Sequence, residues 1–276
     1  MSETRLEIRD GHPTWYLSED IWVVPGSNPM GGPGTPVEGA QAYLWARVHN
    51  RADFEIADAV VDFYWIRNGV GVHSKTAVKH GSASVTIPGN ASADVLCLRP
   101  WIVPGKACVV VETYHPAFDP LSPARKSPAK DPHVAQRNLT ILHAGKNSLL
   151  IGERAFSVLP FMVNNPFREE QVFTVSAEPA DLASLDALIE TGGLDGGLLG
   201  AGGEVEIVGF TQTAYPGPAE LELARKEIQD LRLPPGHHID LHLVAQLQGD
   251  AALVDVIQTR DGEQVGGLSC LFVQGE

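Results

Sequence analysis

The alternation of apolar and polar residues is clearest over residues 41–67, where it has the period of two that is typical of half-buried β-strands. The first segment runs through Tyr43, Leu44, Trp45, Ala46, Arg47 and Val48. The second runs through Ala59, Val60, Val61, Asp62, Phe63, Tyr64 and Trp65. Between them lie Asn50 and Asp53, which favour a turn. We therefore predict a pair of strands around which the rest of the chain is organised.

Short apolar runs recur about every ten residues elsewhere in the chain, separated by Pro, Gly and Asn, and this spacing indicates β-sandwiches. In the first half these runs are residues 21–24, 85–87, 95–98, 108–113 and 134–142. In the second half they are residues 156–163, 171–176, 204–213, 239–246, 253–259 and 267–273. We predict an all-β protein with two tandem immunoglobulin-like β-sandwich domains, at residues 1–139 and 140–276.

Two short helical insertions are predicted in the second domain. Asp181 is a suitable N-cap for a helix over residues 180–190, which carries leucine at positions 182, 185 and 188. A second helix is predicted over residues 218–231, because one helical face would hold Leu221, Ala224, Ile228 and Leu231.

Two dipeptides carry strong hairpin signals. Asn68-Gly69 follows the central strand pair, and Asp261-Gly262 lies between the last two apolar runs. Asn-Gly and Asp-Gly are the preferred residues of two-residue hairpin turns. We therefore predict a hairpin at each position.

The net charge of −14 is unevenly distributed. Residues 1–139 hold 13 basic and 14 acidic residues, a net of −1, whereas residues 140–276 hold 7 and 20, a net of −13. Nucleic acids and anionic membranes are bound through basic patches, so the charge argues against both. An acidic surface usually serves solubility, and a basic partner for the second half is the alternative.

Three features bear on the cellular compartment. The first ten residues lack the apolar run of a signal peptide, and no stretch reaches 18 apolar residues, so we expect neither a leader nor membrane insertion. The expected location is cytoplasmic, although leaderless export would leave no trace in the sequence. Three cysteines without a dense framework fit a reducing compartment. Pairing of Cys97 with Cys108 across a hairpin is left open.

The segment around the central strand pair resembles the bacterial immunoglobulin-like modules of the CARDB type. Residues 47–53 read Arg-Val-His-Asn-Arg-Ala-Asp and residues 59–65 read Ala-Val-Val-Asp-Phe-Tyr-Trp. The family pairs an Arg-Val-x-Asn-x-Gly strand end with a Val-x-Val-x-Phe-Tyr strand, but its glycine is Ala52 here. Residues 131–138 also resemble the closing strand, so the likeness covers about residues 20–140. It implies a β-sandwich with a binding or spacer role.

One stretch could hold a metal ion. His238, Asp240 and His242 alternate along a predicted strand and therefore share one face. Two imidazoles and a carboxylate are suitable ligands for zinc or another divalent ion. The alternative is an ordinary exposed strand face, because ligands in a row on one strand lie about 7 Å apart and seldom converge. We expect no cofactor, with a divalent metal here as the alternative.

The aromatic residues suggest a binding surface. Tyr43, Trp45 and Tyr64 lie opposite the core-facing residues of their strands and would form an aromatic patch if that face is exposed. The alternative is that another part of the chain covers them. With no nucleophile elbow and no clustered carboxylates, the sequence argues against an enzyme.

The predicted function is therefore a non-catalytic binding, spacer or assembly module, bacterial and part of a larger complex. We expect a protein partner or a homo-oligomer, with carbohydrate as another ligand. The alternative function is a metal-binding protein or metal-dependent enzyme centred on His238, Asp240 and His242.

Overall fold

The computed structural model describes the chain except residues 1–4, 12, 122–127, 145–147, 152–153 and 276. The chain forms two compact units. Unit 1 contains Met1–Arg67, His73–Asn138 and Ala187–Asp195, and unit 2 contains Asn68–Val72, Leu139–Asp186 and Gly196–Glu276. No helix in the described part of the chain is long and apolar enough to cross a membrane.

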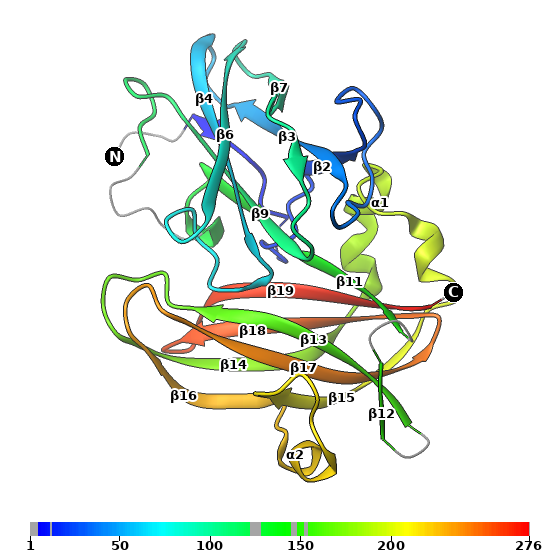
Figure 1. Ribbon diagram of the computed structural model, residues 1–276. Helices are drawn as coiled ribbons and strands as arrows, with labels where there is room; N and C mark the ends of the chain where they lie inside the picture. The colour runs from blue at the N-terminus through cyan, green and yellow to red at the C-terminus, as the bar shows by residue number, and fades with distance from the viewer. Residues whose placement is uncertain (1–4, 12, 122–127, 145–147, 152–153, 276) are drawn as a thin grey trace. The chain divides into compact units, whose positions relative to one another are not determined.

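Unit 1 consists of two antiparallel sheets that enclose one core. In the first sheet, β3 is central and its neighbours are the other four strands. The members are β1 (Leu6–Glu7), β2 (Ile21–Pro25), β3 (Gln41–Asn50), β7 (Ser92–Leu96) and β8 (Trp101–Ile102). The second sheet has the order β10 (Val134–Arg137), β9 (Ala107–Tyr114), β4 (Ile56–Arg67) and β6 (Val78–Ile87) (Figure 1).

The predicted alternation along β3 and β4 is confirmed. Leu44, Ala46 and Val48 from β3 have no measurable exposure, and the same holds for Ala59, Val61 and Phe63 from β4. These side chains belong to the same core cluster, which joins the two sheets. Because successive residues of a strand point to opposite faces, the pattern predicted these core-facing side chains, but it did not predict the burial of Tyr43, Asp62 and Tyr64 on the other faces of β3 and β4.

Unit 2 is also a two-sheet sandwich. One sheet has the order β11 (Leu139–Ala144), β19 (Glu263–Gln274), β18 (Ala251–Arg260), β14 (Gln171–Ala180) and β16 (Glu227–Leu233). The other has the order β12 (Ser148–Ile151), β13 (Arg154–Asn164), β17 (His238–Gly249) and β15 (Gly203–Thr211), with β5 (Gly69–Val70) parallel to β13. Figure 1 shows β18, β19 and β14 in one layer, with β17 and β15 in the other. The all-β, immunoglobulin-like sandwich prediction is thus confirmed as a fold class.

The two units repeat one topology. The order β10-β9-β4-β6 in unit 1 corresponds to β19-β18-β14-β16 in unit 2, and the pair β3-β7 corresponds to β13-β17. In both units the chain leaves one sheet after a central strand, forms two strands of the opposite sheet, and returns, as in immunoglobulin-like sandwiches. Unit 2 differs because β15 and the helices are inserted between β14 and β16.

A buried asparagine fixes the same turn in each unit. Nδ2 of Asn50 donates to the carbonyl oxygens of Phe54, Ile87 and Pro88, and Oδ1 accepts from the amide of Ala52. Nδ2 of Asn165 donates to the carbonyl oxygens of Glu169, Leu233 and Pro234, and Oδ1 accepts from the amide of Phe167. One side chain therefore satisfies four backbone groups at the end of a central strand in each sandwich.

The two predicted helical insertions have different outcomes. The first is confirmed, with a 3₁₀ turn at Leu182–Leu185 followed by α1 (Asp186–Glu190), and Asp181 caps it by accepting from the amide of Ala183 at 2.9 Å. Two further 3₁₀ turns lie at Pro128–Lys130 and Gly196–Leu199.

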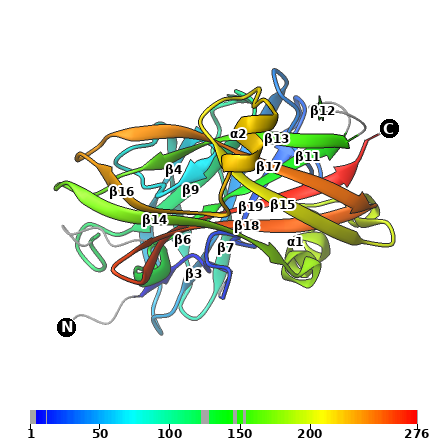
Figure 2. The same cartoon turned by 90° about the horizontal axis from the view of Figure 1, so that it is seen from below.

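The second helical prediction, over residues 218–231, is wrong beyond residue 223. The helix α2 (Pro218–Leu223) is followed by strand β16, and Ile228 and Leu231 pack against the core from that strand. Asp230 between them has a φ of 55°, and the register of β16 against β14 shifts at this place. Ile228 and Leu231 therefore share a face across a β-bulge, which gives them a helix-like spacing. In Figure 2, α2 lies next to β15 and β17, and its Leu221 packs against a small cluster of Phe156, Val158 and Val244.

The two predicted hairpin turns also differ. Asp261 and Gly262 have φ values of 52° and 77° and join β18 to β19, as expected for a type I′ turn. The hairpin predicted at Asn68-Gly69 is wrong, because Gly69 lies in β5, parallel to β13. A Cβ atom on Gly69 would lie 2.4 Å from the carbonyl oxygen of Met162, so this glycine permits a close backbone approach instead of a turn.

Candidate functional site

Two tryptophans form an aromatic platform on the outer face of the first sheet of unit 1. Trp22 of β2 and Trp45 of β3 are direct cross-strand partners, and their rings stack with centroids 5.8 Å apart and planes 12° apart. The guanidinium of Arg47, two residues along β3, lies 5.8 Å from the centre of the Trp22 ring. Cross-strand register thus places two indoles and a guanidinium side by side, each partly exposed to solvent.

The connection between β2 and β3 folds back onto this platform. The indole nitrogen of Trp45 donates to the carbonyl oxygen of Pro29 at 3.0 Å. The amide of Gly34 donates to the carbonyl oxygen of Val23 at 2.9 Å. Residues 28–31 form a tight turn, in which the amide of Gly31 donates to the carbonyl oxygen of Asn28. The glycines and prolines of this loop, which the sequence marks as irregular, therefore become one wall of a pocket.

The resulting pocket has a volume of about 300 Å³. It is lined by Glu19, Trp22, Val24, Met30, Gly31, Pro33, Trp45, Arg47, Asp94 and Thr191. Asp94 of β7 forms a two-pronged ion pair with Arg47, with Nε–Oδ1 and Nη2–Oδ2 distances of 2.7 and 3.1 Å. Arg9 forms an ion pair with Glu19, with an Nη1–Oε1 distance of 3.2 Å. Both carboxylates at the pocket are thus paired with arginines.

A half-buried arginine, Arg137, anchors the wall that Thr191 belongs to. The guanidinium of Arg137 donates to the carbonyl oxygens of Ile21, at the start of β2, and Gly193. Burial lowers the pKa of Arg137 to about 10, so the side chain is still charged at neutral pH. A Cβ atom on Gly193 would lie 2.5 Å from Nη1 of Arg137, so a larger residue at this position would displace the guanidinium. Arg137 therefore fixes the segment after α1 next to the aromatic platform.

The chemistry of the pocket suits recognition. The residues that line it include one hydroxyl group, that of Thr191, but no cysteine, serine or histidine. Its carboxylates are neutralised by arginines, so neither is free to act as a base or nucleophile. Indole faces, a flexible methionine and an Arg–Asp pair are typical of surfaces that bind other molecules without reacting with them.

The predicted aromatic patch of Tyr43, Trp45 and Tyr64 is not one surface. Tyr43 is only 8% exposed, and its hydroxyl accepts from Nε2 of Gln41 at 3.0 Å. Tyr64 is 7% exposed and lies in β4, in the other sheet of unit 1. Trp45 belongs to the pocket, with Trp22, Arg47 and Asp94 as neighbours. The sequence did not identify this group, because it depends on the register of three strands.

Tyr64 instead belongs to a buried polar network. Its hydroxyl donates to Oε2 of Glu112 at 3.1 Å and lies 3.4 Å from Oδ2 of Asp62. Asp62 also accepts from Ser82 at 2.6 Å and pairs with Lys79 at 2.9 Å, while Ser74 donates to Glu112. Two carboxylates that are far apart in sequence are therefore cross-strand neighbours. Their partners hold them in place, which indicates a structural role.

A second cluster that the sequence analysis did not identify surrounds His133 of unit 1. Its Nδ1 lies 2.8 Å from Asp131 and its Nε2 lies 3.1 Å from Asp119, and all three side chains are buried. Burial opposes protonation, but hydrogen bonds and charges of both aspartates outweigh it and raise the pKa of His133 to about 9. Oδ2 of Asp119 also accepts from the amides of Arg5 and Leu6, so this cluster holds β1 in place.

The predicted metal ligands lie on β17, in unit 2. His238 and Asp240 are exposed, and His242 is half-buried. They face Asn164, Met162 and Pro160 on β13, none of which has a side chain suited to bind zinc. Among the residues that the structure describes, no group of three histidine, cysteine, aspartate or glutamate side chains is arranged to hold a metal ion.

The three cysteines are buried and none of them forms a disulfide, so Cys97 and Cys108 are not bonded to each other. Cys97 lies beside Gly81 in unit 1, and burial raises the pKa of its thiol. A raised thiol pKa lowers the fraction of the reactive thiolate at neutral pH.

No known protein-family model and no curated protein matches this sequence. Among solved structures, red sea bream transglutaminase is 11% identical with a TM-score of 0.25, covering 93% of this chain and 31% of that protein. Alpha-2-macroglobulin from E. coli is 8% identical with a TM-score of 0.27, covering 93% of this chain and 17% of that protein. The chain thus spans less than a third of these proteins. The values are too low to support any argument, so the architecture rests on the sheet topology above.

Proposed function

We propose that the protein is a non-catalytic binding module and that the pocket over Trp22 and Trp45 takes an extended segment of a partner protein. The observation that carries this proposal is the composition of the pocket. Tryptophan, arginine and methionine are the residues enriched in protein interfaces, and Trp22, Trp45, Arg47 and Met30 meet here. Met30 is 72% exposed, so its apolar side chain is available to a partner.

The resemblance of residues 20–140 to CARDB-type modules supports the same proposal, because those modules are mostly binding or spacer units. Stacked indoles provide a flat apolar surface for proline or aliphatic side chains, and the rim of paired charges provides hydrogen bonds that fix their orientation. A carbohydrate could use the same features, since sugar rings also stack on indoles. The experiment therefore includes both ligand classes.

The test uses a phage-displayed library of 12-residue peptides and a glycan array. Peptides are selected on the intact protein alone, and their binding is then measured on a Met30→Glu variant, which places a charge at the pocket mouth without touching the core. We expect selected peptides to change the tryptophan fluorescence of the protein and to bind Met30→Glu at least tenfold more weakly. A matched Leu98→Glu variant should bind like the wild type, because Leu98 is 79% exposed in unit 1 but does not line the pocket.

Two outcomes would overturn the proposal. If every selected peptide binds Met30→Glu and the wild type equally, the pocket is not the binding site. If no peptide is enriched but a glycan binds and is lost in Met30→Glu, the ligand is a carbohydrate and not a protein segment.

A further inference from the structure

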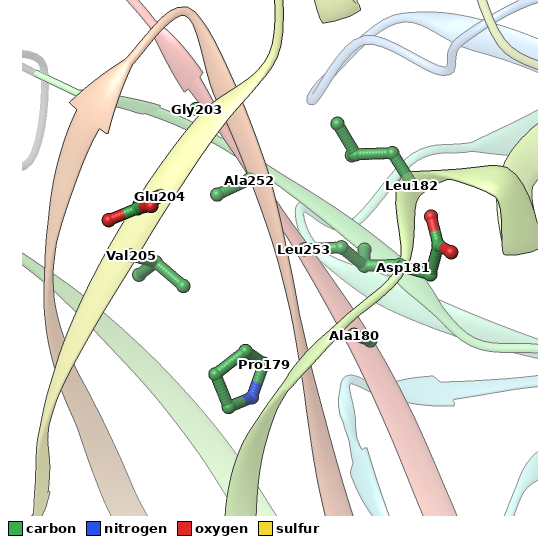
Figure 3. Close-up of a pocket in the computed structure, with 9 residues that line it drawn as sticks. All are labelled: Pro179, Ala180, Asp181, Leu182, Gly203, Glu204, Val205, Ala252 and Leu253. Atoms are coloured by element: carbon green, nitrogen blue, oxygen red, sulfur yellow. The ribbon is translucent and has the colours of Figure 1, made fainter.

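An apolar groove in unit 2 opens between its two sheets. It has a volume of about 470 Å³ and is formed by the end of β14, the start of β15 and the start of β18. Figure 3 shows Pro179, Val205, Ala252, Leu253 and Leu182 around it. Two carboxylates, of Asp181 and Glu204, flank the groove on opposite sides, and none of its nine lining residues is basic.

One wall of the groove is a strand edge. β15 pairs with β17 along one side, and on its other side residues 203–208 have no strand partner among the described residues. The edge becomes occupied at Phe210, whose amide donates to the carbonyl oxygen of Arg225 at 2.8 Å. The register shift between Ile207 and Gly209 marks the same boundary. Along these six residues, or roughly 20 Å of strand, every second residue therefore presents its backbone donor and acceptor at the groove.

The opposite wall cannot pair in this way. The ladder between β14 and β16 ends at Ser176, so the last residues of β14 are free of strand partners on that side among the described residues. One of these residues is Pro179, which has no amide hydrogen. An added strand would therefore join β15 and point alternate side chains into the groove.

The negative charges around the groove favour a strand that carries basic residues. Glu204 is exposed and has no charged partner among the described residues, and residues 140–276 carry a net charge of −13. Along β15, Val205 and Ile207 face the core side, whereas Glu204 and Glu206 face outward, and Glu206 is already paired with Arg154. A strand in which apolar residues alternate with lysine or arginine would place its apolar side chains in the groove and its cations beside these carboxylates.

We infer that the free edge of β15 and its adjoining groove form a second binding site, which takes a basic, alternating apolar segment of a partner protein by β-strand addition. This site lies in unit 2, and it is independent of the aromatic pocket in unit 1. Main-chain hydrogen bonds supply affinity, and the groove and carboxylates supply specificity.

The test uses an acetylated, amidated heptapeptide in which lysine and leucine alternate. Binding to the full chain is followed by calorimetry and by amide hydrogen exchange. We expect protection of the amides of residues 203–208. We also expect at least tenfold weaker binding of the matching peptide in which glutamate replaces lysine. Two further peptides test the main-chain hydrogen bonds. One is N-methylated at its odd-numbered residues and the other at its even-numbered residues, and at least one of the two should bind tenfold more weakly than the parent peptide.

Two variants test the site itself. Glu204→Gln with Asp181→Asn removes both charges while an amide at 181 still caps the following turn, and it should weaken binding about tenfold. The control, Glu170→Gln with Asp261→Asn, removes two exposed charges elsewhere in unit 2 and should bind like the wild type. Ala180→Trp should fill the groove and abolish binding, and hydrogen exchange of the free protein shows whether this variant folds.

The inference is overturned if the lysine and glutamate peptides bind equally, or if both N-methylated peptides bind as tightly as the parent. It is also overturned if protection appears away from residues 203–208, or if the control variant loses as much affinity as the double variant at the groove.

Discussion

Units 1 and 2 share a topology and an asparagine anchor, but they bury different polar groups. Among the described residues, every buried aspartate, glutamate and histidine belongs to unit 1: Asp20, Asp62, His80, Glu112, Asp119, Asp131 and His133. The buried polar residues of unit 2 are uncharged: Asn68, Thr140, Ser157, Asn164, Asn165, Thr211, Gln258 and Ser269. Yet residues 140–276 hold 20 of the 34 acidic residues of the chain.

The two units therefore place their charged residues differently. Unit 1 has almost balanced charges and uses some of them inside the fold, where burial makes stability depend on protonation. No acidic residue of unit 2 in the described part of the chain is fully buried, so its carboxylates stay in contact with water and give the surface a negative potential. We therefore expect stability to respond to pH mainly in unit 1, and charge-dependent binding mainly in unit 2. The five tryptophans all lie in unit 1, so tryptophan fluorescence reports on that unit alone.

The largest effect is expected from the feature that the units share. Replacing Asn50 or Asn165 by alanine leaves three carbonyl oxygens and one amide without their side-chain partner, so each change should cost about 3 kcal/mol or more. Urea unfolding should show the loss for Asn50→Ala by tryptophan fluorescence and by circular dichroism, whereas Asn165→Ala should shift the circular dichroism transition alone.

The matched control is Asn28→Ala, in an exposed turn of unit 1, which should change stability by less than about 1 kcal/mol. If Asn165→Ala shifts the fluorescence transition as much as Asn50→Ala does, the two units unfold as one, and the comparison between them cannot be resolved by unfolding.

The second-largest effect is expected in the pH dependence of the stability of unit 1. The pKa of His133 in the folded protein, about 9, lies above its ordinary value of 6.5, so its contribution is complete below pH 6.5 and is lost as pH rises through 9. Burial tends to raise the pKa of Asp119, but His133 and the amides of Leu6 and Arg5 hold it below its ordinary value. The contribution of Asp119 is therefore present above about pH 4 and is lost on acidification.

The contributions of His133 and Asp119 are therefore both present between about pH 4 and 6.5, and unit 1 should lose up to about 3 kcal/mol from His133 by pH 10. Fluorescence-detected urea unfolding across this range measures the loss. His133→Gln should flatten the curve above pH 6.5. An unchanged slope in that variant would mean that another group causes the pH dependence.

The smallest effect is expected at the alternating residues of β17. His238 is exposed, so His238→Ala should change stability by less than about 0.5 kcal/mol. We also expect that adding zinc chloride leaves the melting temperature unchanged, because in the described part of the chain no group of three histidine, cysteine, aspartate or glutamate side chains is arranged to hold a metal ion. A rise of several degrees that disappears in His238→Ala, together with about one zinc ion per chain by elemental analysis, would support a metal site instead.

The sequence by itself determined which faces of the strands are buried. The residues along β3 and β4 alternate, and one face of each strand is fully buried, because a strand has only two faces and water is excluded from one of them. It also determined the hairpin at Asp261-Gly262 and the cap at Asp181, since both depend on residues within four positions of each other. Local signals of this kind act before any tertiary contact forms.

Only the tertiary structure decided which residues meet across strands. Trp22, Trp45 and Asp94 form one pocket through the register of β2, β3 and β7, and the sequence does not encode that register locally. Tertiary pairing with β14 also converted the apparent helical spacing of Ile228 and Leu231 into a bulged strand. In both cases the burial gained by pairing distant segments exceeds the small free-energy differences between local conformations, so the pairing decides the outcome.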